Sequence, residues 1–458
     1  MTHRSRFGLV ATCDRVIGDL SDLTRTGAKG IGMGIHRRKF LTSIAAAGAA
    51  SLGFSAAASG GADAWTEAHE SGELLLFGYE GRLDSPRIDF QERSSVLTRV
   101  RLKDGAVESV KLPMEKAHIA MPLGQGRVLC CPQNGPHALV VDRENRIVQR
   151  FEAPKGFFYS GHGLLLNDRS VLLVPLCKTS RSSVADRGAV EVYDAKDLRL
   201  LRRIEDWGIN PHEIQYLPSR NELVVADYGT LTTAGRPVLT TFGQSCIFTC
   251  DPDTLAVKKV YDQTDLNGAV THVRVTDDGQ AYVILQQSVF MDTARGERTF
   301  AAAVLDADRV AESEFSLPPR DYALPFIQYK TPEMSVPRPL VKVNLASGQR
   351  QQLLVHPRFH IRPQSVERNV LTGTVLASYT GSDCLVAQRG GESPYIIDGA
   401  DIGLTEVRGL ADIPGTPFVG IAGSERNVSI VDVRTGVSVT RIRSDNFVAP
   451  HMTFARSD

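Results

Sequence analysis

The stretch Leu139-Val140-Val141-Asp142 is a short apolar run that ends in an acidic residue, and it points to the fold. An Asp or Asn at such a position can fold its side chain back onto the following backbone and start a tight hairpin. The same pattern recurs in Val190-Glu191-Val192-Tyr193-Asp194, Ile247-Phe248-Thr249-Cys250-Asp251, Val341-Lys342-Val343-Asn344 and Ser429-Ile430-Val431-Asp432. We therefore expect one structural unit to be repeated along the chain.

The sequence around these copies has the character of an all-β protein. From residue 73 onward, runs of Val, Ile, Leu, Tyr and Thr alternate with Gly, Asp, Asn and Pro turns at intervals of roughly 8 to 12 residues. A long helical period is absent. This pattern predicts a sandwich, a barrel or a propeller, and the longer repeat distinguishes among them.

Seven segments mark the first strand of each repeat and give a second register. They read Ala117-His118-Ile119, Gly161-His162-Gly163, Pro211-His212-Glu213, Thr271-His272-Val273, Gln364-Ser365-Val366, Arg408-Gly409-Leu410 and Pro450-His451-Met452. Most spacings are about 42 to 60 residues, which suits four strands and their turns. We predict a seven-bladed β-propeller over 73–458, with an insertion at about 287–337.

The ends of the chain fit a closed ring. Three expected strands, at about 74–80, 95–102 and 106–112, precede His118, and one strand follows Pro450. We expect the last blade to be closed by these three N-terminal strands and the one C-terminal strand. Such closure leaves no free sheet edge.

The N-terminus has the composition of an export signal. His36-Arg37-Arg38-Lys39 precedes an Ala-rich stretch that has no charged residue as far as Ala58. We interpret 33–58 as a twin-arginine signal peptide, 59–72 as a linker, and 1–32 as an upstream extension, with Met33 as a possible true start. The predicted location is the periplasm, with no stable membrane span after signal removal because the apolar stretch is short and small-sided.

Charge and cysteine content narrow the function classes. Lys plus Arg and Asp plus Glu number 52 each, so no overall field favours nucleic acid. Six cysteines follow the signal, but Cys246 and Cys250 are four residues apart on one expected strand, which is too far for a disulfide. We interpret most of the cysteines as small buried hydrophobic residues.

Several blocks resemble a known family. These blocks are similar, in the same order along the chain, to blocks of domain-of-unknown-function family 1513: Tyr159 to Gly163, Arg187 to Asp194, Gly208-Ile209-Asn210-Pro211-His212-Glu213, Leu223 to Gly229 and Gln286-Gln287. The resemblance implies a periplasmic seven-bladed propeller with a twin-arginine signal, often encoded beside iron-uptake components. It implies no established activity.

Five histidines share one point of the repeat. They are His118, His162, His212, His272 and His451. First strands line the channel of a propeller, so these imidazoles should converge at one mouth, with the open side facing Ser365 and Gly409. Neutral imidazole is a ligand for iron, copper or zinc. The alternative is structural, since a Gly-His pair can serve a hydrogen-bond network alone.

The leading hypothesis is a metal-binding periplasmic propeller that is linked to iron uptake and works with other periplasmic iron-uptake components. A second hypothesis is a propeller hydrolase or isomerase, such as a lactonase, that uses Glu213 and Arg187 at the channel mouth. Adjacent strand residues point to opposite faces, so His212 and Glu213 both face the axis only where the backbone is irregular. A third hypothesis is a non-catalytic interaction scaffold.

Overall fold

The residues that the computed structural model describes all lie within one compact unit, Ala56–Asp458. The expected extension at 1–32 and signal peptide at 33–58 lie outside the described residues. The described residues are 59–79, 94–115, 117–181, 183–231, 241–242, 244–263, 266, 268–287, 289–292, 297–300, 338–356, 359–423, 427–443 and 451–456.

The described residues are nearly all β-structure, and this confirms the all-β prediction. The strands form antiparallel sheets, most of them with four strands. Besides strands, these residues contain the helix α2 (Ser59–Ser71) and the 3-10 turns Asn167–Arg169 and Pro218–Arg220.

One sheet joins the two ends of the described chain, in the order β3-β2-β1-β33. Its strands are β1 (Gly72–Tyr79), β2 (Ser94–Arg101), β3 (Val107–Glu115) and β33 (Met452–Arg456). Leu74 of β1 lies opposite Val100 on β2 and opposite Phe454 on β33. The three N-terminal strands and the C-terminal strand therefore share a sheet, as the sequence predicted.

The next strands form a nine-stranded sheet in the order β12-β11-β10-β8-β5-β6-β7, with β4 paired to β5 and β9 paired to β10. Their bounds are β4 (Ala117–Gly124), β5 (Arg127–Gly135), β6 (His137–Val141), β7 (Ile147–Glu152), β8 (Phe157–Ser160), β9 (Leu164–Leu166), β10 (Val171–Lys178), β11 (Ala189–Asp194) and β12 (Leu200–Glu205). The short strand β8 joins the two halves, because it pairs with β5 on one side and with β10 on the other.

Four further four-stranded sheets follow in chain order, and each is a simple antiparallel meander. The first has β13 (Pro211–Leu217), β14 (Glu222–Asp227), β17 (Cys246–Cys250) and β18 (Val257–Asp262). The second has β19 (Gly268–Val275), β20 (Gln280–Gln287), β23 (Leu340–Asn344) and β24 (Arg350–Leu353). The third has β25 (Pro363–Asn369), β26 (Thr374–Tyr379), β27 (Cys384–Arg389) and β28 (Tyr395–Asp398). The fourth has β29 (Leu410–Asp412), β30 (Phe418–Ala422), β31 (Asn427–Asp432) and β32 (Val437–Arg443).

Burial falls from the inner to the outer strands of a sheet. Strand β14 is buried along its whole length, whereas β18, at the outer edge of the same sheet, is mostly exposed. A strand whose two faces are both covered reads as a continuous apolar run, and Leu223-Val224-Val225-Ala226 is such a run. The sheets therefore pack face to face through their inner strands.

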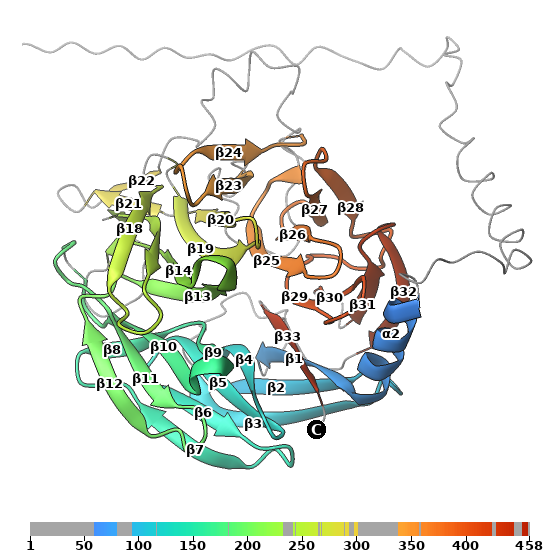
Figure 1. Ribbon diagram of the computed structural model, residues 1–458, viewed down its shortest axis with the longest axis horizontal. Helices are drawn as coiled ribbons and strands as arrows, with labels where there is room; N and C mark the ends of the chain where they lie inside the picture. The colour runs from blue at the N-terminus through green and yellow to red at the C-terminus, as the bar shows by residue number, and fades with distance from the viewer. Residues whose placement is uncertain are drawn as a thin grey trace, which may run out of the picture. The chain divides into compact units, whose positions relative to one another are not determined.

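The hydrophobic core is divided among clusters that lie between successive sheets. One cluster joins Val224 of β14 to Val283 of β20, and three others likewise join successive sheets. A further cluster joins the two halves of the nine-stranded sheet. The last cluster joins Ile430 of β31 back to Leu74 of β1. Another joins Phe77 of β1 to the following sheet. The packing order thus returns to its start, and Figure 1 shows the strands of these sheets around a common centre.

Residues 59–72 were expected to be a linker, but the structure places the helix α2 over most of them. The helix is held by tertiary contacts. The ring of Trp65 lies 4.7 Å from that of Phe418 on β30, and Ala68 is buried. The helix was not predicted because local composition alone does not reveal this packing surface.

The insertion and the cysteines complete the description. Within 287–337, the hairpin of β21 (Val289–Asp292) and β22 (Glu297–Phe300) is described, and most of the remainder lies outside the described residues. The six described cysteines are buried, as predicted for most of them, and all six are free. In the described part of the chain, no helix has the length and apolarity needed to cross a membrane.

Candidate functional site

The structure brings the five predicted histidines together from five different places in the fold. We call His118, His162, His212, His272 and His451 the histidine cluster. Three of them lie on β4, β13 and β19, one lies between β8 and β9, and one immediately precedes β33. All five side chains are buried, with exposed fractions of 0 to 4%.

The imidazoles of the cluster are in direct contact. Nε2 of His118 lies 3.0 Å from Nε2 of His212. The ligand nitrogens of His118, His162, His212 and His272 all lie within 4.8 Å of one another. The ring of His451 lies 4.2 Å from that of His118, 4.4 Å from that of His272 and 4.7 Å from that of His162, measured between centroids.

Register shifts in the first strands make this convergence possible. In the β13–β14 pair, Pro211 lies opposite Asp227 and Glu213 lies opposite Ala226, so His212 is an extra residue in its strand. A bulge of this kind re-aims the side chains around it. His212 and Glu213 are therefore both buried at the site, although neighbours on a regular strand point to opposite faces. The irregular backbone that the sequence argument required is present.

The same shift recurs in other first strands, between Ala117 and Ile119, between Val270 and His272, and between Pro363 and Ser365. In β4 the extra residue is His118, as in β13 it is His212. In β19 the extra residue is Thr271, which leaves His272 in the position that Glu213 has in β13. Glu213 and His272 therefore occupy matching positions in neighbouring sheets.

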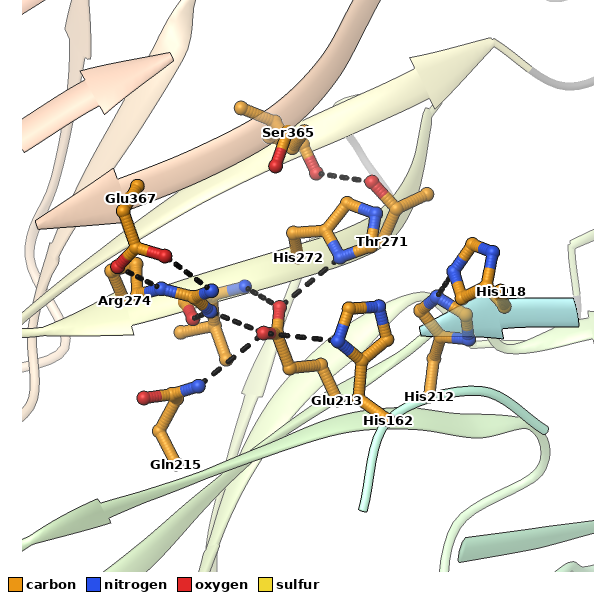
Figure 2. A network of polar contacts seen from close by, with 12 residues as sticks. His118, His162, His212, Glu213, Gln215, Thr271, His272, Arg274, Ser365 and Glu367 are labelled. Atoms are coloured by element: carbon orange, nitrogen blue, oxygen red, sulfur yellow. Dashed lines mark hydrogen bonds and ion pairs between the residues drawn. The ribbon is translucent and has the colours of Figure 1, made fainter. Parts of the chain in front are cut away.

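The carboxylate of Glu213 holds two members of the cluster by their Nδ1 atoms (Figure 2). Its Oε2 accepts hydrogen bonds from Nδ1 of His272 at 3.1 Å and from the backbone N–H of Val273 at 3.0 Å. Its Oε1 lies 3.5 Å from Nδ1 of His162 and also accepts from Arg274. With Nδ1 engaged by a carboxylate, each ring presents Nε2 to the rest of the cluster.

Arg274 keeps Glu213 ionised. Burial opposes ionisation of the carboxyl, but the charge of Arg274 and the hydrogen bond from His272 outweigh it, so that the pKa of Glu213 falls to about 2. The guanidinium also pairs with Glu367 through Nε at 2.8 Å and Nη2 at 3.1 Å. Arg274 was not singled out from the sequence. Its signal is its spacing, because it follows His272 by two residues and so shares a strand face with it.

His212 is fixed by backbone groups. Its Nδ1 donates to the backbone oxygen of Ser160, which leaves Nε2 directed at His118. The segment before it is held by the carboxylate of Asp227, which accepts from the backbone N–H groups of Ile209 at 2.7 Å and Asn210 at 2.8 Å. The motif Gly208 to Glu213 and the Asp227 that follows it therefore act together to place this imidazole.

Burial keeps these imidazoles neutral. It is the largest cause that lowers the pKa of His118, His162 and His451 well below the usual value, and their histidine neighbours add to it. The pKa of His212 falls to about 3 for the same reasons. A neutral imidazole has a free lone pair on one nitrogen, which is the form that binds a metal.

Three of those nitrogens have no hydrogen-bond partner among the described residues. They are the buried Nε2 atoms of His162, His272 and His451. Buried polar atoms in folded proteins are nearly always paired, so each such exception requires an explanation. A purely structural set of histidines would satisfy both nitrogens of each ring. Several converging nitrogens without protons are the donor set that a transition-metal ion takes.

The side of the cluster that was expected to be open is packed at Gly409. A Cβ atom on Gly409 would lie 3.0 Å from the carbonyl carbon of His451, so the two backbones are in contact. Ser365 is buried, and its N–H donates to the hydroxyl of Ser378 at 3.0 Å. At Gly409 two backbone segments of the chain therefore lie close together, and this position is not an opening.

The groups suggested for an enzyme have other partners. Glu213 is engaged with His162, His272 and Arg274. Arg187 lies near Asp227, where its charge partly offsets the effect of burial, which raises the pKa of that carboxyl.

Comparison with solved structures finds only distant similarity. A protein of unknown function from Bacteroides caccae shares 11% identity with this chain, with a TM-score of 0.44 over 84% of this chain and 98% of the other. Hydrazine synthase from Kuenenia stuttgartiensis shares 13% identity, with a TM-score of 0.45 over 77% of this chain and 90% of the other. A chain of the nidogen/laminin complex shares 10% identity, with a TM-score of 0.39 over 72% and 99%.

Comparison of sequences finds a match to a protein family. No curated protein matches this chain. Residues 114–304 match the family model described as "Protein of unknown function (DUF1513)". The matched segment contains Glu213 and four members of the histidine cluster, and His451 lies beyond it. This match over residues 114–304 confirms the family resemblance that the sequence predicted.

Proposed function

We propose that this protein binds a transition-metal ion at the histidine cluster. The observation that carries the proposal is the set of three buried Nε2 atoms, on His162, His272 and His451, that have no hydrogen-bond partner and face other imidazoles. An ion bound by these nitrogens would satisfy all three at once. Iron, copper and zinc are the candidate metals, since each accepts imidazole ligands.

The distances suit a site that closes around an ion. Two nitrogens that are each about 2.0 to 2.1 Å from one ion are roughly 2.8 to 3.4 Å apart at ordinary coordination angles. The 3.0 Å between Nε2 of His118 and Nε2 of His212 falls in this range. The limit of 4.8 Å for the four ligand nitrogens is wider, so binding would draw the remaining rings inward.

The charges around the cluster favour a cation. Burial lowers the pKa of His118, His162, His212 and His451 and keeps them neutral, and the formal charges of the neighbouring Glu213, Arg274 and Glu367 sum to about −1. A bound divalent ion would be attracted to this excess of negative charge, and Glu213 would orient two of its ligands, His162 and His272. Such carboxylate–histidine pairs raise the basicity of the ligand and fix its orientation.

We propose further that the fold is a seven-bladed β-propeller. The closed order of the hydrophobic clusters supports this, as does the sheet that combines β1, β2 and β3 with β33. In this interpretation the nine-stranded sheet is two adjacent blades, β4 to β7 and β9 to β12, connected by β8. The histidines then stand on first strands around one axis, where ligands from separate blades can meet.

The cellular setting is also a proposal. The paired arginines Arg37 and Arg38, with the uncharged stretch behind them, support export by the twin-arginine pathway to the periplasm. Family resemblance supports a link to iron uptake, with other periplasmic iron-uptake components as partners, by binding or transfer of the ion. The burial of the cluster favours ion binding over a lactonase-like hydrolase or isomerase, because an organic substrate needs an open concave site.

Elemental analysis tests metal binding. Wild-type protein from the periplasm and a triple variant, His162→Gln with His212→Gln and His272→Gln, would be compared after incubation with Zn(II), Cu(II) or Fe(II) and removal of free ion. We expect retained metal in the wild type and its loss in the triple variant. The matched control is His360→Gln, because His360 is a buried histidine outside the cluster. Equal metal content in wild type and triple variant, with circular dichroism showing both folded, would overturn the proposal.

A further inference from the structure

His451 differs from the other members of the cluster in its place in the chain. It immediately precedes β33, which is the last described strand, whereas the other four histidines lie between residues 118 and 272. Strand β33 forms the edge of the sheet that also contains β1, β2 and β3. Within the cluster, His451 is therefore the member that adjoins β33, the strand that pairs the last described part of the chain with β1.

The imidazole of His451 is fully part of the cluster. Its ring contacts those of His118, His162 and His272, and its Nε2 is one of the three buried nitrogens without a partner. The backbone behind it packs against Gly409, so the ring is backed by main chain and directed at the other histidines.

The attachment of β33 combines backbone pairing with packing, since Met452 and Ala455 are buried in two hydrophobic clusters. Its ladder with β1 runs from Met452 opposite Leu76 to Arg456 opposite Gly72. The hydroxyl of Thr453 donates to the backbone oxygen of Ala120 on β4. The ion pair between Arg456 and Glu67 is exposed, and exposed pairs contribute little. Short terminal strands of this kind open more readily than central ones.

We propose that His451 is a ligand of the bound ion and that the ion thereby couples metal binding to the docking of β33. This inference rests on the proposed function. An ion held by His451 and by the other histidines would join the C-terminal strand directly to β4, β13 and β19. Such a cross-link closes a long loop between His451 and the other histidines. It therefore reduces the conformational entropy that the chain gains when β33 detaches. The coupling is reciprocal, so detachment of β33 weakens metal binding by the same factor.

The burial of the site is consistent with this coupling. Side chains that are 0 to 4% exposed give an ion in solution no direct path to their nitrogens. Opening at β33 removes one of the five rings and exposes the others. Loading and release of the ion should therefore proceed through the open form, and exchange of bound metal should be slow while β33 is docked.

Hydrogen–deuterium exchange on the full protein tests the coupling. Exchange of the β33 amides would be compared between chelator-treated protein and the same protein with Zn(II) at a large excess over its dissociation constant. We expect exchange in β33 to slow at least about tenfold on loading. Strand β28 serves as an internal reference, because its sheet contributes no histidine to the cluster.

Two variants separate a ligand role from a packing role. His451→Gln should bind Zn(II) at least about tenfold more weakly, since even loss of a residue that only contacts a metal ligand lowers the affinity by this factor. Zn(II) should also no longer slow hydrogen exchange in β33 of this variant. His360→Gln should keep the protection. If His451→Gln does not fold, the wild-type comparison still decides the question.

The outcomes distinguish the two proposals. Tight Zn(II) binding by the wild type without a change in β33 exchange would overturn the coupling and leave the metal site intact. Tight binding with β33 protection that persists in folded His451→Gln would exclude His451 as the ligand responsible. Failure of the wild type to bind Zn(II), Cu(II) or Fe(II) would overturn the proposed function and this inference together.

Discussion

Nδ1 of His272 donates a hydrogen bond to Oε2 of Glu213 at 3.1 Å, although the two residues lie on strands of different sheets. This contact fixes the proton of His272 on Nδ1 and leaves Nε2 with a lone pair inside the cluster. Because the other carboxylate oxygen faces Nδ1 of His162, one acidic side chain sets the orientation of two imidazoles. The order of the site therefore depends on a residue that would not itself touch the ion.

Replacement of this carboxylate should weaken metal binding. In Glu213→Gln only one oxygen remains as an acceptor, and the amide N–H₂ opposes an Nδ1–H donor. We expect the affinity for Zn(II) to fall about 10- to 100-fold, as it does when outer-shell partners of metal ligands are lost. A competition titration with a chromophoric chelator measures the change.

Glu191→Gln is the matched control for this variant. Glu191 is a buried carboxylate that pairs with an arginine, Arg203, at 2.7 Å, and it lies on β11 among tyrosines. Its replacement should reduce stability without changing the affinity for Zn(II). An equal loss of affinity in both variants would show that Glu213 acts only through general stability.

Removal of Arg274 should destabilise the protein strongly. The side chain is 16% exposed and lies between Glu213 and Glu367, so Arg274→Met leaves two neighbouring carboxylates without their cation. Breaking a buried pair by removing one partner costs about 3 to 5 kcal/mol in the free energy of unfolding. Urea denaturation measures this loss. The double variant with Glu213→Gln should lose less than the sum of the two single variants, and strict additivity would contradict the interpretation.

The sequence predicted the convergence of the histidines for a clear physical reason. A repeat with a fixed register places equivalent residues at equivalent points in space, so the shared position of His118 and His212 was informative even without coordinates, whereas His272 is offset from that position by one residue. The pairing of the C-terminal strand with the N-terminal strands was predicted on similar grounds. Both inferences depend only on periodicity along the chain.

Features that arise from local irregularity or distant packing could not be predicted in this way. Regular strand geometry places His212 and Glu213 on opposite faces, and only the bulge at His212 brings both to the site. The helix α2 was not predicted, and its residues were interpreted as a linker. The contact that holds it, between Trp65 and Phe418, joins residues far apart in the chain and is not visible in the local sequence. Arg274 was missed because its role depends on a carboxylate from another sheet.

Gly161→Ala should disturb the cluster through a steric clash. Gly161 has a φ of +132°, and an added Cβ atom would overlap the imidazole of His212. We expect displacement of that ring, a Zn(II) affinity lower by at least about tenfold, as for other disturbed ligands, and a loss of about 1 to 3 kcal/mol from overpacking. Isothermal titration and urea denaturation measure the two effects.

Gly156→Ala separates this clash from backbone strain. Gly156 also has a positive φ, +88°, but an added Cβ would meet nothing within 4 Å. This variant should lose about 1 to 2 kcal/mol from the left-handed conformation alone and should bind Zn(II) as the wild type does. If both alanines reduced the affinity equally, contact with His212 would not be the cause.

His360 should make the protein less stable in mild acid. Burial, together with the nearby His356, lowers the pKa of His360 to about 3 in the folded state, against about 6.5 in the unfolded chain. Its Nε2 accepts the N–H of Val355 at 3.0 Å, and its ring lies 5.1 Å from that of Tyr379. Protonation would place a second N–H against Val355, so the folded state resists it.

The direction of this change in stability with pH follows from the linkage between proton binding and folding. Between pH 6.5 and about 3 the unfolded chain binds the proton and the folded chain does not, so stability is lost as pH falls through this window. At about 1.4 kcal/mol per pH unit, a change from pH 7.5 to pH 5 costs about 2 kcal/mol through this group. His360→Gln keeps an acceptor for Val355 but does not titrate, so its loss over the same interval should be about 2 kcal/mol smaller. Urea denaturation at the two pH values measures the difference. His360→Phe, which lacks the acceptor, should be less stable throughout but should show the same flatter pH dependence, whereas a wild-type slope in both variants would contradict the assignment.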